Sequence, residues 1–285
     1  MQRKVISSRL IIGGIILLIV AILAGLGIAN LSRREVVGAP TPIAATSSGI
    51  YTAYETTVYK FDARTGVLLW HYQSDNRYSV FSTAPTVVGN SVYISTGNAL
   101  YALDATTGKA RWQQHWGAYN NSSDAVPVVS GNVVYVVAID GALHALDTST
   151  GKELWSKVVD IATNIVPGQP ATQGMLYLLQ GFSLHAINAR TGVELWQTSL
   201  LNTGASTSSF QVTDVLVANN MVYASFSYYN GGGVFSAIDA KSGKQLWSTQ
   251  LEKGYQFFHL LASNPLVYMV ATPIAAGKSF YEAAY

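Results

Sequence analysis

Two histidines, His144 and His185, are the side chains best suited to acid–base chemistry or metal binding. A neutral imidazole exchanges protons near neutral pH and is the commonest metal ligand in proteins. Both histidines occupy one position of an internal repeat, and that position holds Tyr59, Tyr101 and Ser236 in the other copies. Because a position that accepts Tyr, His and Ser has no fixed chemistry, the pattern favours a structural role in a strand over a catalytic one.

Four acidic residues outside the repeated turns are the candidate cation ligands, namely Asp75, Asp124, Asp140 and Asp214. Calcium takes about six to eight oxygen ligands, whereas these acids are scattered over predicted loops, where a turn-forming role is the simpler interpretation. The chain has no cysteine, which excludes a disulfide, a thiolate metal site and a Cys nucleophile. The sequence therefore predicts no catalytic residue, no metal site and no cofactor-binding residue.

A nine-residue motif, Asp-x-x-Thr-Gly-x-x-x-Trp, sets the positions of these side chains. Asn188 and Ser242 are the only departures from its Asp and Thr, and successive tryptophans lie 42, 43, 41 and 51 residues apart. The five copies run from Asp62 to Trp70, Asp104 to Trp112, Asp147 to Trp155, Asn188 to Trp196 and Asp239 to Trp247. A repeat of about 40 residues in fixed phase is typical of a solenoid or a propeller.

Each copy of the motif predicts a tight turn between two strands. The Asp or Asn side chain accepts hydrogen bonds from backbone amides two or three residues on, and the Gly supplies a positive φ. We expect five glycines to be structural: Gly66, Gly108, Gly151, Gly192 and Gly243. Since a Trp buries roughly 150–250 Å², we interpret the five motif tryptophans as clamps between neighbouring units.

Each repeat predicts four short antiparallel strands. The second repeat has strands at 84–89, 91–96, 99–104 and 109–116, and the third at 126–129, 133–139, 142–147 and 152–158. Alternating apolar residues in short runs bounded by turns indicate strand rather than helix. Four strands in about 42 residues match one blade of an all-β propeller. A β-sandwich is the structural alternative, but it does not explain five tryptophans in phase.

The block from Gly141 to Trp155, with strands such as Val92–Ser95 and Val134–Val137 before it, resembles the PQQ-like, quinoprotein-type β-propeller repeat. The resemblance covers residues 43–285. The family includes quinoprotein alcohol dehydrogenases, the outer-membrane assembly lipoprotein of Gram-negative bacteria and many extracellular domains. The resemblance therefore implies a bacterial propeller, and closed members of the family commonly have about seven or eight blades.

Five blades are complete in this sequence, and a sixth is partial. Its strands begin at Leu260, continue from Leu266 to Val270 and reach Tyr281, before any turn and Trp. One interpretation is a truncated product with an incomplete ring. The other is a six-bladed ring whose last strand comes from Glu35–Val37.

The resemblance also names the alternative cofactors, pyrroloquinoline quinone and calcium. Dehydrogenases of this family use a vicinal disulfide, a calcium held by carboxylate and Asn, and an Asp base. This chain departs from them because it has no cysteine and no dense acidic loop. We therefore expect a non-catalytic binding or scaffold module, with a pyrroloquinoline-quinone-dependent dehydrogenase, or a truncated relative of one, as the alternative.

Strand polarity separates the loops into two faces. The repeated turns lie on one face, and long, varied connections lie on the other, which we call the long-loop face. Its loops are 71–83, 113–125, 199–213, 228–233 and 250–259. Variable loops on a rigid scaffold are usual binding surfaces, and aromatic and Arg side chains are usual anchors. The candidate partner-binding residues are Arg77, Tyr78, Trp116, Tyr119, Tyr228 and Tyr229. The alternative is that these aromatic residues only pack over the blade ends.

The N-terminal region predicts a membrane anchor. Residues Leu10–Ala29 are uncharged and apolar, and at about 1.5 Å per residue they span a bilayer core. Basic residues before the run place residues 1–9 in the cytoplasm, followed by the transmembrane helix 10–29, a linker at 30–42 and an extracytoplasmic propeller at 43–285. Beyond Arg9 the chain has 14 basic and 15 acidic side chains. Because this part has no net positive charge, nucleic acid is a poor partner.

We predict that the apolar run is an uncleaved anchor in the cell membrane. The alternative is a signal peptide, but its apolar region is normally about 7–15 residues long. N-terminal sequencing of the protein extracted from membranes should therefore read from the start of the chain. A mature N-terminus near Asn30 would contradict the prediction.

Overall fold

The computed structural model describes residues 43–74, 80–81, 83–96, 98–117, 126–159, 164–166, 174–200, 210–228, 232–251, 255–263, 266–273 and 281–284. The predicted helix at 10–29, the linker at 30–42 and the proposed closing strand Glu35–Val37 lie outside these residues. Within the described ranges, no helix is long and apolar enough to cross a membrane.

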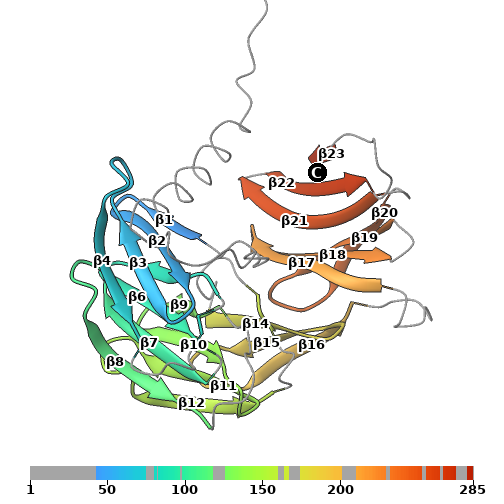
Figure 1. The fold of residues 1–285 in the computed structure, drawn as a ribbon. Coiled ribbons are helices and arrows are strands. Elements are labelled where there is room, and N and C mark those ends of the chain that lie inside the picture. Colours follow the sequence, from blue (N-terminus) through green and yellow to red (C-terminus); the bar gives the residue numbers. More distant parts are fainter. Residues whose placement is uncertain are drawn as a thin grey trace, which may run out of the picture.

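Six antiparallel sheets follow one another in sequence order around a common centre, from the blue sheet of blade one to the red sheet of blade six (Figure 1). Blade one comprises β1 (Ile43–Thr46), β2 (Gly49–Tyr54), β3 (Thr57–Phe61) and β4 (Leu68–Gln73). Blade two comprises β5 (Thr86–Val88), β6 (Ser91–Ser95), β7 (Ala99–Asp104) and β8 (Ala110–His115). Blade three comprises β9 (Val128–Ser130), β10 (Val133–Val137), β11 (Ala142–Asp147) and β12 (Glu153–Val158).

Blades four to six continue the same order. Blade four comprises β13 (Asn164–Ile165), β14 (Met175–Gln180), β15 (Ser183–Asn188) and β16 (Glu194–Ser199). Blade five comprises β17 (Phe210–Ala218), β18 (Met221–Tyr228), β19 (Gly233–Asp239) and β20 (Gln245–Leu251). Blade six has three described strands, β21 (Tyr255–Ser263), β22 (Leu266–Pro273) and β23 (Tyr281–Ala284). The prediction of an all-β propeller with four-stranded PQQ-like blades is confirmed.

The first strand of each blade lies innermost. β1 contacts β5, β5 contacts β9, and β17 contacts β21, whereas the fourth strand is the outer edge of its sheet. The apolar core lies between blades rather than within one: Leu100 of blade two, Leu143 of blade three and Leu178 of blade four belong to one buried cluster. Each sheet therefore needs its neighbours to bury both of its faces.

The predicted strand bounds are most accurate beside the turns, since 99–104 and 142–147 match β7 and β11 at both ends. The connections predicted at 199–213 and 250–259 are too long, because β17 and β21 extend into them. Each of these strands contains a bulge, between Val212 and Asp214 and between Phe257 and His259. Asp214 therefore lies in a strand, which corrects its predicted place in a loop.

The tryptophan of each of the first four blades lies against the turn glycine of the next blade. A Cβ atom built on Gly151 would lie 2.6 Å from the Trp112 ring, and one on Gly192 would lie 2.8 Å from the Trp155 ring. These glycines also have φ near +71° and +72°. Glycine is thus required twice at this position, by the backbone conformation and by the close approach of the indole.

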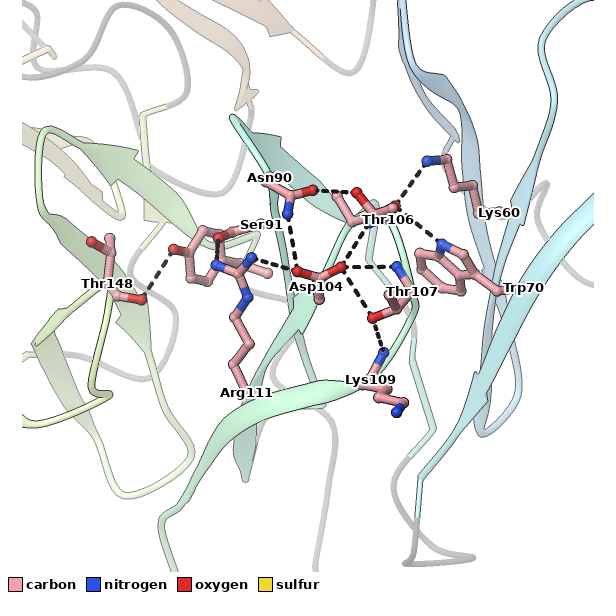
Figure 2. A network of polar contacts seen from close by, with 12 residues as sticks. Lys60, Trp70, Asn90, Ser91, Asp104, Thr106, Thr107, Lys109, Arg111 and Thr148 are labelled. Carbon is pink, nitrogen blue, oxygen red and sulfur yellow. Dashed lines mark hydrogen bonds and ion pairs between the residues drawn. The ribbon is translucent and has the colours of Figure 1, made fainter.

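One backbone carbonyl in each of these turns accepts hydrogen bonds from the preceding blade. The Thr148 carbonyl accepts from Trp112 Nε1 at 3.0 Å and from the Tyr93 hydroxyl at 3.3 Å. In blade two, Lys60 Nζ and Trp70 Nε1 point at the same carbonyl, that of Ala105, at 2.8 and 3.1 Å (Figure 2). We call this arrangement, in which an indole covers a glycine and two donors share a turn carbonyl, the interblade latch.

The latch predicts that Trp155→Ala lowers the free energy of unfolding by about 3–5 kcal/mol, the range for removing a packed aromatic ring. The substitution removes the contact with Gly192 and the hydrogen bond from Nε1 to the Ala189 carbonyl, which is 3.2 Å long. Trp247→Ala is the matched control, because the Trp247 side chain is 38% exposed and should cost less than half as much. Urea unfolding followed by circular dichroism measures both. Equal losses for the two variants would contradict the clamp role.

Candidate functional site

The carboxylates of the repeated motif are engaged inside their own turns. Asp147 Oδ1 accepts hydrogen bonds from the amides of Ser149 and Thr150 at 3.0 and 2.8 Å, and from both hydroxyls at 2.5 and 2.8 Å. These donors, led by the Ser149 hydroxyl, lower the pKa of Asp147 from 3.8 to about 2. Asn188 accepts the corresponding two amides in blade four, so the position needs an acceptor rather than a charge.

Asp104 has a further set of partners on its second oxygen (Figure 2). Arg111 Nη2 donates to Asp104 Oδ2 at 2.6 Å, and Asn90 Nδ2 donates to the same oxygen at 3.0 Å. The Arg111 guanidinium is the main reason that the pKa of Asp104 lies well below its usual range, followed by the Thr107 amide. This ion pair lies on the turn face, away from the long-loop face.

Two of the four candidate cation ligands are described, and both hold the backbone. Asp140 Oδ1 accepts the amide of Ala142 at 3.0 Å, so Asp140 is the turn residue that the sequence predicts. Asp214 accepts the amide of Leu260 at 2.7 Å, which joins blade five to blade six. Asp75 and Asp124 lie outside the described residues. Among the residues that the structure describes, no group of three or more His, Asp or Glu side chains is arranged to hold a metal ion.

His144 is buried between two carboxylates. Its Nδ1 lies 2.6 Å from Glu153 Oε2, and its Nε2 lies 3.1 Å from Asp140 Oδ2. The ring of Trp116, from the end of blade two, stacks on the imidazole at a centroid distance of 4.5 Å and an interplanar angle of 26°. Among the described residues, His185 makes the equivalent of the Glu153 contact alone, from Nδ1 to Glu194 Oε2 at 3.0 Å. Both nitrogens of His144 thus contact carboxylates, and the face of its ring stacks on Trp116.

Trp116 is the candidate partner-binding residue whose position is best defined. It follows β8 at the long-loop face, its amide donates to the Asn98 carbonyl at 2.7 Å, and its ring is partly exposed. Tyr228 ends β18, and its ring packs partly against the core of blades four and five. Four other candidates lie outside the described residues: Arg77, Tyr78, Tyr119 and Tyr229.

One set of structural residues was not predicted from the sequence, namely the tyrosines that donate to the latch. Tyr93, Tyr135 and Tyr177 each occupy the second strand of a blade and donate to a turn carbonyl of a later blade. Burial raises the pKa of the Tyr135 hydroxyl. Their regular spacing in the sequence, with Tyr51 and Tyr223 in the same phase, is the signal that would have identified them.

Residues 54–280 match the family described as outer membrane protein assembly factor BamB. No curated protein matches the sequence. The fold is similar to that of BamB from Moraxella catarrhalis, with 17% identity, a TM-score of 0.56, and coverage of 86% of this chain and 87% of that one. It is also similar to the computationally designed Ika8 protein, with 19% identity, a TM-score of 0.61, and coverage of 80% and 67%.

A third similar structure is the quinohemoprotein alcohol dehydrogenase ADHIIG from Pseudomonas putida HK5. It shares 18% identity with a TM-score of 0.54, and the match covers 80% of this chain and 50% of that one. This chain therefore spans about half the length of that enzyme. At these identities the likeness shows the fold alone.

Acid should destabilise the protein in part through Asp147. Because its folded pKa of about 2 lies below the ordinary 3.8, the carboxylate stabilises the fold above about pH 4, and this contribution is lost as the pH falls toward about 2. Asp147→Asn keeps an acceptor oxygen, as Asn188 does, but cannot titrate. Urea midpoints measured between these pH values should therefore fall less steeply in the variant than in the wild type.

The reciprocal change, Asn188→Asp, is the matched control. It adds a carboxylate to an equivalent turn, so the urea midpoint should fall more steeply with decreasing pH than in the wild type. Identical pH dependence in the wild type and both variants would contradict this account of the turns.

Proposed function

The chain belongs to the PQQ-like repeat family described as outer membrane protein assembly factor BamB, and we propose that it is a non-catalytic scaffold that binds a protein partner through its long-loop face. In this proposal the propeller lies outside the cytoplasm, and residues 10–29 anchor it to the cell membrane as a single helix. The length of the apolar run and the charged residues on either side of it support the anchor. The family description supports an envelope location and a role in assembly with other proteins.

The observation that carries the proposal is the stacking of Trp116 on His144. A partly exposed aromatic ring held in one orientation loses little conformational freedom on binding, which is the property of an interface anchor. His144 is held in turn by Asp140 and Glu153, at 3.1 and 2.6 Å. His144, one of the two histidines best suited to chemistry, and Asp140, a candidate cation ligand, thus serve to position an aromatic ring at the binding face.

The dehydrogenase alternative has less support. The likeness to quinohemoprotein alcohol dehydrogenases concerns the fold alone, and the sequence has no cysteine for the vicinal disulfide that the resemblance implies. In the described turns, the Asp carboxylates of the motif are engaged by backbone amides. We therefore propose no cofactor for this chain.

Trp116→Ala tests the proposed function. The full-length protein, extracted from membranes in mild detergent after cross-linking in cells, should retain a specific protein partner, and the variant should lose most of it, because truncating an interface anchor typically costs about 2 kcal/mol or more. Leu195→Ala is the matched control: Leu195 is a large apolar side chain, 50% exposed, on an outer strand, and its loss should leave the complex intact. Similar melting temperatures would establish that both variants are folded. Equal recovery of the partner by the wild type and Trp116→Ala would overturn the proposal.

A further inference from the structure

The two ring nitrogens of His144 both lie within hydrogen-bonding distance of a carboxylate. Nδ1 is 2.6 Å from Glu153 Oε2, and Nε2 is 3.1 Å from Asp140 Oδ2. A neutral imidazole has one N–H donor and one accepting nitrogen, whereas an ionised carboxylate only accepts. Two such contacts therefore need a proton on both ring nitrogens, or a proton on one carboxyl group. In either case the three side chains together hold one proton more than a neutral imidazole and two carboxylates.

Of the three side chains, His144 is the one suited to carry the additional proton. An imidazole is a stronger base than a carboxylate. The His144 side chain is 5% exposed, whereas those of Asp140 and Glu153 are 34% and 43% exposed, so water helps to keep both carboxylates ionised. Burial alone disfavours a charged imidazole, but a carboxylate at each nitrogen favours it. The geometry therefore fits an imidazolium held between two anions.

The other described groups around this imidazole carry no charge. Val136 of β10 and Ser156 of β12 pair with His144 across the sheet. The Ser156 hydroxyl donates to Glu153 Oε1 at 3.0 Å, so it positions the carboxylate rather than the imidazole. From blade two the imidazole meets an indole, which is uncharged. The acidic residue in the connection after that indole, Asp124, lies outside the described residues.

His185 occupies the equivalent position in blade four and has different surroundings. Its Nδ1 lies 3.0 Å from Glu194 Oε2, and no described carboxylate lies within hydrogen-bonding distance of its Nε2. A neutral imidazole with its proton on Nδ1 satisfies that single contact. No described aromatic ring stacks on His185. Of the two histidines, His144 alone thus combines a second carboxylate with a stacked indole, which makes His185 an internal control.

We propose that Asp140, His144 and Glu153 form a proton-dependent support for the Trp116 ring. While both ring nitrogens of His144 are protonated, the two carboxylates fix the plane of the imidazole. Its positive charge then lies over the indole face at a centroid distance of 4.5 Å, which is a favourable cation–π arrangement. When one proton leaves, a nitrogen lone pair faces a carboxylate oxygen, so that contact breaks and the imidazole can turn away from Trp116.

Nε2 is the nitrogen that loses its proton, because its carboxylate contact is the longer of the two. The Ala142 amide donates to Asp140 Oδ1 at 3.0 Å, so the carboxylate stays in place and repels the deprotonated nitrogen. The Trp116 ring then loses its fixed orientation. The consequence for partner binding rests on the proposed function: binding should weaken as the pH rises from about 5 to about 8, the range in which imidazole groups ordinarily titrate.

Fluorine NMR of the full-length protein in detergent micelles, labelled with fluorotryptophan, tests the support without any partner. The Trp116 signal is identified by its absence in Trp116→Phe. Its chemical shift should change in a single step between about pH 5 and about pH 8. His144→Gln should abolish the step. Asp140→Asn should lower its midpoint by roughly one pH unit or more, because a charge that retains the proton is lost. His185→Gln is the matched control and should leave the step unchanged.

Asp140→Asn keeps the proposal testable even if His144→Gln perturbs the fold, because an Asn oxygen can still accept the Ala142 amide. Three outcomes would overturn the proposal: no pH-dependent step in the Trp116 signal, a step that persists in His144→Gln, or an unchanged midpoint in Asp140→Asn.

A second measurement separates this proposal from the proposed function. Photo-cross-linking in isolated membranes should recover roughly twofold to fivefold less partner at about pH 8 than at about pH 6, the effect of losing a cation–π contact. In His144→Gln the recovery should be equal at both pH values. If the Trp116 signal titrates but Trp116→Ala recovers as much partner as the wild type, the proposed function fails and the proton-dependent support stands. If Trp116→Ala loses the partner but wild-type recovery is the same at both pH values, the proposed function stands and its regulation by pH is overturned.

Discussion

The contact between a tryptophan ring and a turn glycine of the next blade is the constraint on which the rest of this structure depends. The indole approaches the backbone so closely that no side chain fits, which fixes the glycine, and the positive φ of that glycine fixes the turn. Two backbone amides of the turn, those two and three residues after its first position, require an acceptor. This requirement fixes the Asp or Asn at that first position. One packing contact thus accounts for three of the four defining positions of the motif. It also makes each blade's stability depend on the blade beside it.

Most of the residues that are suited to chemistry have structural roles in this scaffold. Amides and hydroxyls of the turns lower the pKa values of Asp62, Asp147 and Asp239. The Arg111 guanidinium is the main cause of the lowered pKa of Asp104. His144 bridges two strands and a loop through two carboxylates. The long-loop face lies opposite the turns and is not constrained by them. On that face the Trp116 ring stacks on His144. Function in such a scaffold is therefore expected in partly exposed side chains that the scaffold orients, such as Trp116.

The sequence predicted the fold well where a local turn sets the register. Strands β7 and β11 match their predicted bounds because the motif fixes their ends. The predicted strand bounds were poorer for β17 and β21, which contain bulges. No local residue pattern in the sequence indicates a bulge. At the candidate site, the stacking of Trp116 on His144 joins two blades, and pairing between side chains of different repeats cannot be read from the repeat itself. The latch tyrosines did recur in phase, but a tyrosine in a strand is equally typical of ordinary core packing.

The four latches are not equal, and the differences indicate which interface is strongest. In the first, Lys60 replaces the tyrosine hydroxyl as the second donor; its buried ammonium lies 2.8 Å from the Ala105 carbonyl and 5.2 Å from the Tyr51 ring centroid. A charged donor contributes about 1.5–3 kcal/mol, against about 0.5–1.5 for a neutral one. In the fourth, the buried Nε1 of Trp196 has no acceptor among the described residues, which costs about 1–3 kcal/mol. The carbonyl is thus the constant element and the donors are replaceable: the first interface has a charged donor, and the fourth lacks the indole donor. Separation of neighbouring blades should therefore be easiest between blades four and five, where the buried indole N–H of Trp196 has no acceptor among the described residues.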